Sequence, residues 1–302
     1  MKKTIIIFFL LLLFAPIVFA DVVDEGLPPG TAVELKASTR QMIHLGMKSD
    51  DAVRLTRAML QNHFNVEQAL KAQQILMNAH QKALPVEPIA GKAFEGMAKH
   101  VKADRIVRAM EKVESRFAFS YARAARLSNQ KSQISQLGDM LAAALAAGLN
   151  HQDAEKICLL IHQKTEDMSR SQQNNLARET LKTAREMARL SVTSKAVTNV
   201  VAKALHRGYS ANEIKSMRES FMSRSRSTSP QDLARSYSEA IGQGKGIHGS
   251  DSSTGMGGDS GDMGGSGGSA GSGGMGGSGG SGGSGGMGGG SGGGGAGPGG
   301  SR

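Results

Sequence analysis

The chain is predicted to be all-α, either a multi-helix bundle or an irregular array of αα-hairpins. Proline is absent from residues 31–84 and from 89–229, and both stretches are rich in Ala, Leu, Met, Gln, Lys, Arg and Glu, which favour helix over strand. Apolar residues recur at helical spacing, and no segment alternates apolar and polar residues for long enough to indicate a strand. We expect a signal peptide at 1–20, a short extended lead-in at 21–30, a helical domain at 31–241 and a disordered tail at 242–302.

The first twenty residues have the pattern of a secretory signal peptide. Lys2 and Lys3 precede an apolar stretch of 16 residues that is interrupted only by Pro16. This stretch is shorter than the ~20 residues that span a bilayer. We therefore expect cleavage between Ala20 and Asp21 through the general secretory route, rather than retention as a membrane anchor. The mature protein is then expected to be soluble, in the periplasm or the medium of a bacterium.

Two segments of the helical domain carry a clear apolar face. In residues 104–127 the apolar positions follow a spacing of three and four: Ile106, Met110, Val113, Phe117, Tyr121 and Ala124. The next segment shows the same pattern at Ile134, Leu137, Leu141, Ala144 and Leu145. We expect each segment to form one helix that turns this face to the core.

The ends of the helices are marked by particular residues. Gly46, Gly148 and Gly208 each follow an apolar segment and precede one apolar residue, as expected of a glycine just beyond a helix C-terminus. Capping residues start the following segments: Asn65 with Gln68, Asn150 with Asp153, Ser210 with Glu213, and Ser229 before Pro230.

These junctions also form an internal repeat, Gly-apolar-x3-acidic-[Ala/Ile]-x2-apolar-x3-apolar. Copies begin at Gly46, Gly148 and Gly208, and weaker copies begin at His63 and Ser191. One interpretation is a tandem α-repeat with a concave binding face. The interpretation that we favour is that successive αα-hairpins need the same caps, because the copies follow no fixed period. Prolines at 85–88 mark a possible sub-boundary, but we expect one continuous helical domain.

The tail contains 33 of the 41 glycines of the chain. It has too little apolar surface to offset the entropy of ordering, so we expect a flexible spacer or solubilising segment.

Cys158 and His162 are candidate metal ligands. They lie four residues apart, with His151 and Glu155 earlier in the same segment, and two such ligands form half a metal site. The favoured interpretation is that Cys158 is a core residue, because it continues an apolar set. No cofactor motif and no nucleophile or phosphate-binding motif is found, so we predict no cofactor and no enzymatic activity.

Charge indicates a second candidate site. Residues 21–241 carry 32 basic and 23 acidic side chains. A possible anion-binding face consists of Arg105, Arg108, Lys112, Arg116, Arg123 and Arg126, interleaved with Phe117, Phe119 and Tyr121. The alternative is a solvated helix face, on which Asp104, Glu111 and Glu114 compensate the basic residues locally.

The sequence therefore predicts a non-enzymatic, exported helical protein that acts as a structural or interaction module in the bacterial envelope or periplasm. Its partner would be a protein or another envelope component. The alternative is a basic extracytoplasmic binder of anionic polymers or lipid headgroups. Specific DNA binding is not expected from an exported chain.

Overall fold

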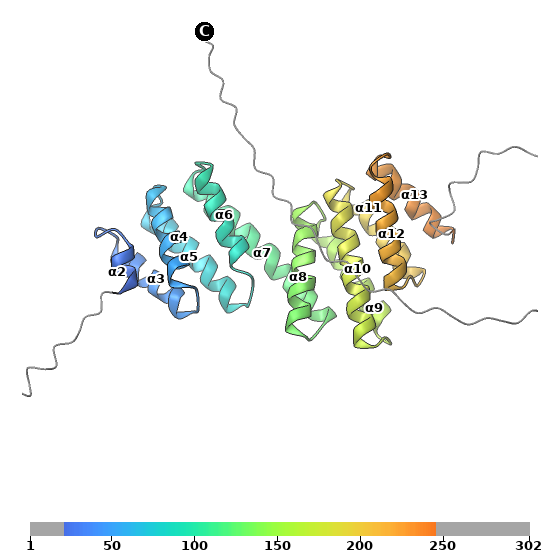
Figure 1. Cartoon of the computed structure of the whole chain (residues 1–302), viewed down its shortest axis with the longest axis horizontal. Helices are drawn as coiled ribbons and strands as arrows, with labels where there is room; N and C mark the ends of the chain where they lie inside the picture. Colours follow the sequence, from blue (N-terminus) through green and yellow to red (C-terminus); the bar gives the residue numbers. More distant parts are fainter. Residues whose placement is uncertain (1–20, 246–302) are drawn as a thin grey trace, which may run out of the picture. The chain divides into compact units, whose positions relative to one another are not determined.

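The computed structural model describes residues 21–245, and every regular element in this range is a helix (Figure 1). In chain order the helices are α2 (Val22–Gly26), α3 (Val33–His44), α4 (Ser49–Gln61), α5 (Val66–Gln81), α6 (Glu87–Ala98), α7 (Ala103–Leu127), α8 (Lys131–Ala146), α9 (His151–Thr165), α10 (Arg170–Arg189), α11 (Ser194–His206), α12 (Ala211–Arg224) and α13 (Pro230–Gly242). The all-α prediction is confirmed for these residues. The predicted signal peptide and residues 246–302 of the predicted tail lie outside them.

The helices pack in two layers. In the odd layer each helix contacts the next but one along the chain, in the order α3, α5, α7, α9, α11 and α13. In the even layer α2, α4 and α6 pack in the same manner, and so do α8, α10 and α12. Each helix therefore belongs to a hairpin and also to a stack of parallel neighbours.

Hydrogen bonds tie the N-terminal ends of the odd-layer helices to one another. The Gln68 amide of α5 donates to Asp104 of α7 over 2.6 Å. The Ser194 hydroxyl of α11 donates to Asp153 of α9 over 2.5 Å, and Gln231 of α13 accepts from the backbone amide just before α11. Because these residues all lie in the first turns of their helices, the odd-layer helices start along one edge of the array.

Two hydrophobic clusters form the core, and α7 belongs to both. One cluster takes its side chains from α3 to α7, with Ala142 of α8, and the other extends from Ala124 of α7 to Ile241 of α13. With 25 residues, α7 is long enough, at about 37 Å, to serve both. Its predicted apolar face is buried except for Tyr121, which is half-buried because its hydroxyl donates to Asp139 over 2.9 Å.

The lead-in at 21–30, expected to be extended, contains the short helix α2. Asp21 accepts a hydrogen bond from the Val23 amide and caps this helix. Val23 and Leu27 are buried against Val53 of α4, so tertiary packing stabilises a helix that is too short to be stable alone.

The prolines at 85–88 do not divide the core. Leu84 and Ile89, on either side of them, belong to the same hydrophobic cluster. Residues 84–86 lie outside the helices, and α6 begins at Glu87 with Pro88 in its first turn. A proline is tolerated there because the first amides of a helix have no partner within it.

Eight of the described helices end in a residue with positive φ. Gly46, Gly148 and Gly208 do so as predicted, with φ of 102°, 117° and 77°. After each, the amide of the next residue donates to a carbonyl five residues earlier, which identifies Schellman caps. In each of these caps the amide of the positive-φ residue also donates to the carbonyl three residues earlier. Five further caps have the same two hydrogen bonds, at Gly244 and at four residues that are not glycine: His63, Ala83, His100 and Ser191.

The N-terminal caps follow the predicted residues at three helices. Asn65 and Ser210 form complete capping boxes at α5 and α12, and Asn150 accepts from the Asp153 amide at α9. Ser229 makes no side-chain cap, but Pro230 opens α13 as predicted.

Candidate functional site

The six basic residues predicted as an anion-binding face all lie on α7. At 3.6 residues per turn they fall within about a quarter of the helix circumference. Two of the acidic residues proposed to compensate them form ion pairs outside α7. Glu111 pairs with Lys71 of α5 and Glu114 pairs with Lys82, the residue that follows α5, at 2.8 and 2.7 Å. These two contacts join α5 to α7.

The C-terminal part of this face is used within the fold. Arg123 forms an ion pair with Glu155 of α9, and Arg126 approaches the same carboxylate at 3.6 Å. The guanidinium of Arg123 lies 5.0 Å from the centre of the Phe119 ring, and Phe119 packs edge-on against His151. These two arginines join α7 to α9 and offer little free charge to a ligand.

The N-terminal part of the face is open. Arg105, Arg108 and Lys112 are exposed and form no ion pair within residues 21–245. Arg108, Lys112 and Arg116 line a shallow hollow of about 500 Å³ together with Leu145 of α8, and Glu111, which pairs with Lys71, also lines it. Four predicted residues thus remain as a basic surface, which we name the α7 surface: Arg105, Arg108, Lys112 and Arg116.

Arg116 is the most buried residue of the α7 surface. Its guanidinium lies 5.9 Å from the centre of the Phe117 ring, and its Nε is buried without an acceptor among the described residues. Burial lowers the pKa of this side chain from its usual value. An anion in the adjacent hollow would therefore compensate a charge that the fold leaves partly desolvated.

Cys158 and His162 do not come together with further ligands. Cys158 is buried in the core, as its apolar spacing predicts, and burial followed by the charge of Glu155 raises the pKa of its thiol to about 12. His162 is exposed on the same helix. Within residues 21–245, no group of three or more His, Cys, Asp or Glu side chains is placed to hold a metal ion.

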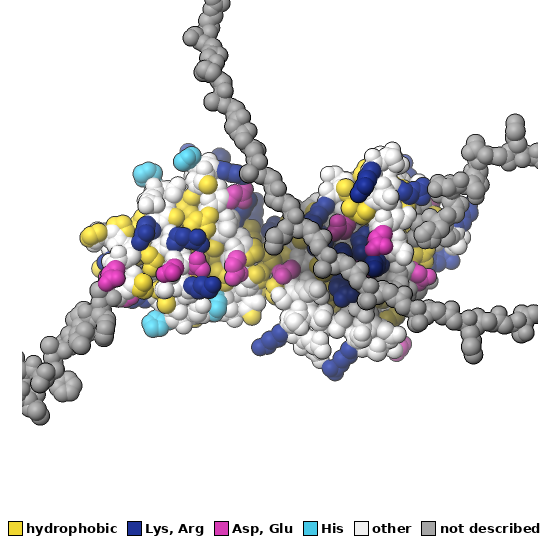
Figure 2. Space-filling view, in the orientation of Figure 1, with side chains coloured by type: hydrophobic (Ala, Val, Ile, Leu, Met, Phe, Trp, Pro, Cys, Tyr) yellow, Lys and Arg dark blue, Asp and Glu magenta, His cyan; other side chains and the backbone are white. Residues whose placement is uncertain are grey.

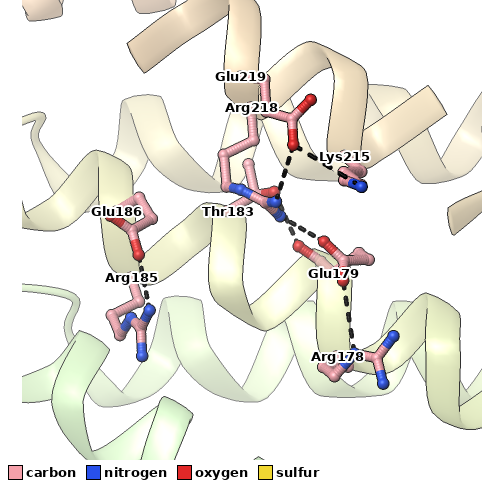
Figure 3. A network of polar contacts seen from close by, with 8 residues as sticks. All are labelled: Arg178, Glu179, Thr183, Arg185, Glu186, Lys215, Arg218 and Glu219. Atoms are coloured by element: carbon pink, nitrogen blue, oxygen red, sulfur yellow. Dashed lines mark hydrogen bonds and ion pairs between the residues drawn. The ribbon is translucent and has the colours of Figure 1, made fainter. Parts of the chain in front are cut away.

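A second group of charges, on α10 and α12, was not recognised in the sequence. Arg218 of α12 donates to Glu179 of α10 over 2.5 Å, and both side chains are almost fully buried (Figure 3). Burial raises the pKa of Glu179, but hydrogen bonding to Arg218 and its charge outweigh this, so the net pKa lies below its usual value. This pair fastens α12 to α10.

Four basic residues lie beside this pair along α10, at spacings of four, three and four: Arg178, Lys182, Arg185 and Arg189. That spacing was the available signal, because it places four side chains on one stripe of a helix. The distribution of charge along the sequence was a second signal. Residues 170–241 carry 13 basic and 6 acidic side chains, and this excess of basic residues accounts for most of the net positive charge of residues 21–241.

None of the helices in the described range is long and apolar enough to cross a membrane. Comparison with protein-family models, with curated proteins and with solved structures finds no match to this chain. A proposal for the function of this protein is therefore argued from the helix layers, charges and surfaces described above.

Proposed function

We propose that this protein is an exported, non-enzymatic scaffold that binds a partner protein or another envelope component through its helix faces. The observation that supports this most strongly is the two-layer packing of α2 to α13. Stacked helix pairs bury their apolar faces against neighbouring pairs and present their outer faces side by side, which creates extended surfaces for partners. The periplasm or the medium of a bacterium is the proposed location.

The start of the described fold is compatible with the proposed cleavage after Ala20. Asp21 caps α2 and forms an ion pair with Arg40 of α3, and Asp24 pairs with the same arginine at 2.7 Å. A chain that begins at Asp21 therefore keeps the contacts that hold its first helix. For residues 242–302 we propose a spacer or solubilising segment, on the basis of their composition.

Cell fractionation with N-terminal sequencing, combined with cross-linking in intact cells, tests this function. We expect the mature chain outside the cytoplasm, with Asp21 as its first residue and with discrete cross-linked complexes. A cytosolic chain that keeps residues 1–20, or a mature chain that forms no cross-linked complex, would contradict the proposal.

The α7 surface supports a second candidate function, binding of an anionic polymer or of lipid headgroups. The observation that supports this function is a set of cations that form no ion pair within the described range and lie beside the hollow at Leu145. We expect the mature chain to bind heparin or anionic vesicles at low salt, and the triple variant Arg105→Gln, Arg108→Gln, Lys112→Gln to lose this binding.

The matched control removes the same charge from exposed lysines of α9 and α11: Lys156→Gln, Lys164→Gln and Lys195→Gln. Equal losses in the two triple variants would show a general charge effect and remove the α7 surface as a site. The absence of binding at low salt would remove the second candidate altogether.

A further inference from the structure

The α10 helix is the middle helix of α8, α10 and α12 in the even layer. None of its residues from 173 to 188 is fully exposed, because α8 packs on one side of it and α12 on the other. These two neighbours do expose side chains, among them Gln136 and Asp139 on α8 and Lys215 and Glu219 on α12. We name the half-buried outer face of α10 between these two helices the α10 trough, and we call α10 its floor.

The floor of the α10 trough is basic. Arg178, Lys182 and Arg185 are half-buried along it, and Arg189 is exposed at its C-terminal end. At a rise of 1.5 Å per residue, the four side chains are separated by about 6, 4.5 and 6 Å along the helix. Figure 3 shows Arg178 and Arg185 on one side of α10, with Arg218 and the other residues of α12 on the opposite side.

These cations are only partly neutralised. Arg178 meets Glu179 at 3.4 Å and Arg185 meets Glu186 at 2.6 Å, but the Nε of Arg185 is buried without an acceptor. Lys182 and Arg189 have no ion pair within residues 21–245. Because the trough reduces hydration, an incoming carboxylate gains more here than it would on an exposed helix face.

We propose that the α10 trough binds an extended, acidic segment of a partner protein. Alternate side chains of an extended peptide lie on one face at about 6.6 to 6.8 Å. Carboxylates at alternate positions therefore come close to the separation of Arg178 from Lys182 and of Arg185 from Arg189, and the long side chains of the floor cations can adjust to the shorter middle separation. This inference rests on the proposed scaffold function and identifies the kind of partner that one surface accepts.

Two features favour a peptide over a densely charged polymer. Asn174 and Asn175 continue the floor towards its N-terminal end and are half-buried. Their amides both donate and accept, as a peptide backbone requires. Glu179 and Glu186 lie beside two of the cations, and they would repel a polymer that carries a charge on every unit. They leave room for separated carboxylates.

The test uses a fluorescent eight-residue peptide that alternates Glu and Ser, titrated with the mature chain at low salt. The trough variant is Lys182→Gln with Arg189→Gln, two residues without an ion pair in the described range, so the fold should be retained. The matched control is Lys156→Gln with Lys195→Gln, on exposed odd-layer positions. We expect anisotropy to show binding that is about fivefold weaker in the trough variant and unchanged in the control.

Several outcomes would overturn the proposal. The first is that the wild-type chain does not bind the peptide that alternates Glu and Ser. The second is that the two double variants lose the same amount of affinity for this peptide. The third is that the wild-type chain binds a peptide that alternates Gln and Ser equally well. Heparin binding that is lost in the trough variant while peptide binding persists would assign the trough to a polyanion instead.

Cross-linking in cells separates this proposal from the scaffold function. If the wild-type chain and the trough variant form the same complexes, the trough proposal fails and the scaffold stands. If the wild-type chain forms none, the scaffold function fails, whatever the peptide does.

Discussion

At the scale of single residues, the fold depends on backbone positions that few side chains tolerate. The left-handed conformation costs a residue with a Cβ roughly 1 to 2 kcal/mol. Glycine avoids this at four of the eight Schellman caps, whereas His63, Ala83, His100 and Ser191 bear it. At those four helices, the two cap hydrogen bonds compensate for the strain.

Ala83→Gly and Gly148→Ala are expected to have opposite effects on stability. The first relieves strain at φ 53°, offset in part by the greater freedom of glycine in the unfolded chain, so we expect a gain of up to about 1 kcal/mol. The second introduces the same strain at φ 117°, where no neighbouring atom would contact the new Cβ, so a loss of about 1 kcal/mol is expected. Urea unfolding measures both, and a change of the same sign in the two variants would contradict this account.

The buried pair of Glu179 and Arg218 is the second residue-scale feature with a measurable consequence. Arg218→Met leaves a carboxylate in an almost fully buried position, so we expect a loss of about 3 kcal/mol at neutral pH. Adding Glu179→Met removes the unpaired charge and should recover most of this loss. If the double variant is no more stable than the single one, shape and not charge holds α12 on α10.

The same pair predicts a pH dependence. The pKa of Glu179 is lower in the folded state than its ordinary value of 4.5, so its contribution is present above that value. It is lost as the pH falls from 4.5 through the folded-state pKa. Unfolding free energies measured between pH 7 and pH 3 should therefore fall less steeply in Glu179→Met, Arg218→Met than in the wild type.

At the scale of helices, close approach matters more than propensity. A Cβ on Gly138 of α8 would overlap the ring of Tyr121 on α7, whereas a Cβ on Gly91 of α6 would meet nothing within 4 Å. Both glycines lie inside helices, so helix propensity alone would favour alanine at either position by about 1 kcal/mol. The contact between α7 and α8 decides the outcome at Gly138.

We expect Gly91→Ala to stabilise the protein by up to about 1 kcal/mol and Gly138→Ala to destabilise it by about 1 to 3 kcal/mol. Thermal unfolding followed by circular dichroism measures both. A stabilising Gly138→Ala would mean that Tyr121 moves aside at little cost, for example by giving up its bond to Asp139.

The helices also show how far sequence patterns extend. Periodicity located α7 within one residue of its start, and glycines and capping residues located several termini, because these are local features of the chain. Caps at Ala83 and His100 were missed, since alanine and histidine are not typical of positive φ. The short helix α2 was missed because only its packing on α4 stabilises it.

At the scale of the whole molecule, the two hydrophobic clusters meet at α7 and α8. Phe221 of α12 is fully buried in the C-terminal cluster, away from α3 to α5. We expect Phe221→Ala to cost about 3 to 5 kcal/mol. In hydrogen exchange it should speed exchange in α9 to α13 far more than in α3 to α5, because stacked helices are coupled mainly through their neighbours. Uniform acceleration would contradict this and show one fully cooperative unit.

The sequence by itself determined the helical class, several helix limits and most of the apolar faces of α7 and α8, because each follows from spacing and capping along the chain. It also placed six cations on one face of one helix. Only the tertiary structure decided which of these remain open, since Glu155 on α9 engages Arg123 and Arg126 while α5 takes the nearby acids. The α10 trough likewise exists only because α8 and α12 stand on either side of its floor, and no local pattern records which helices become neighbours.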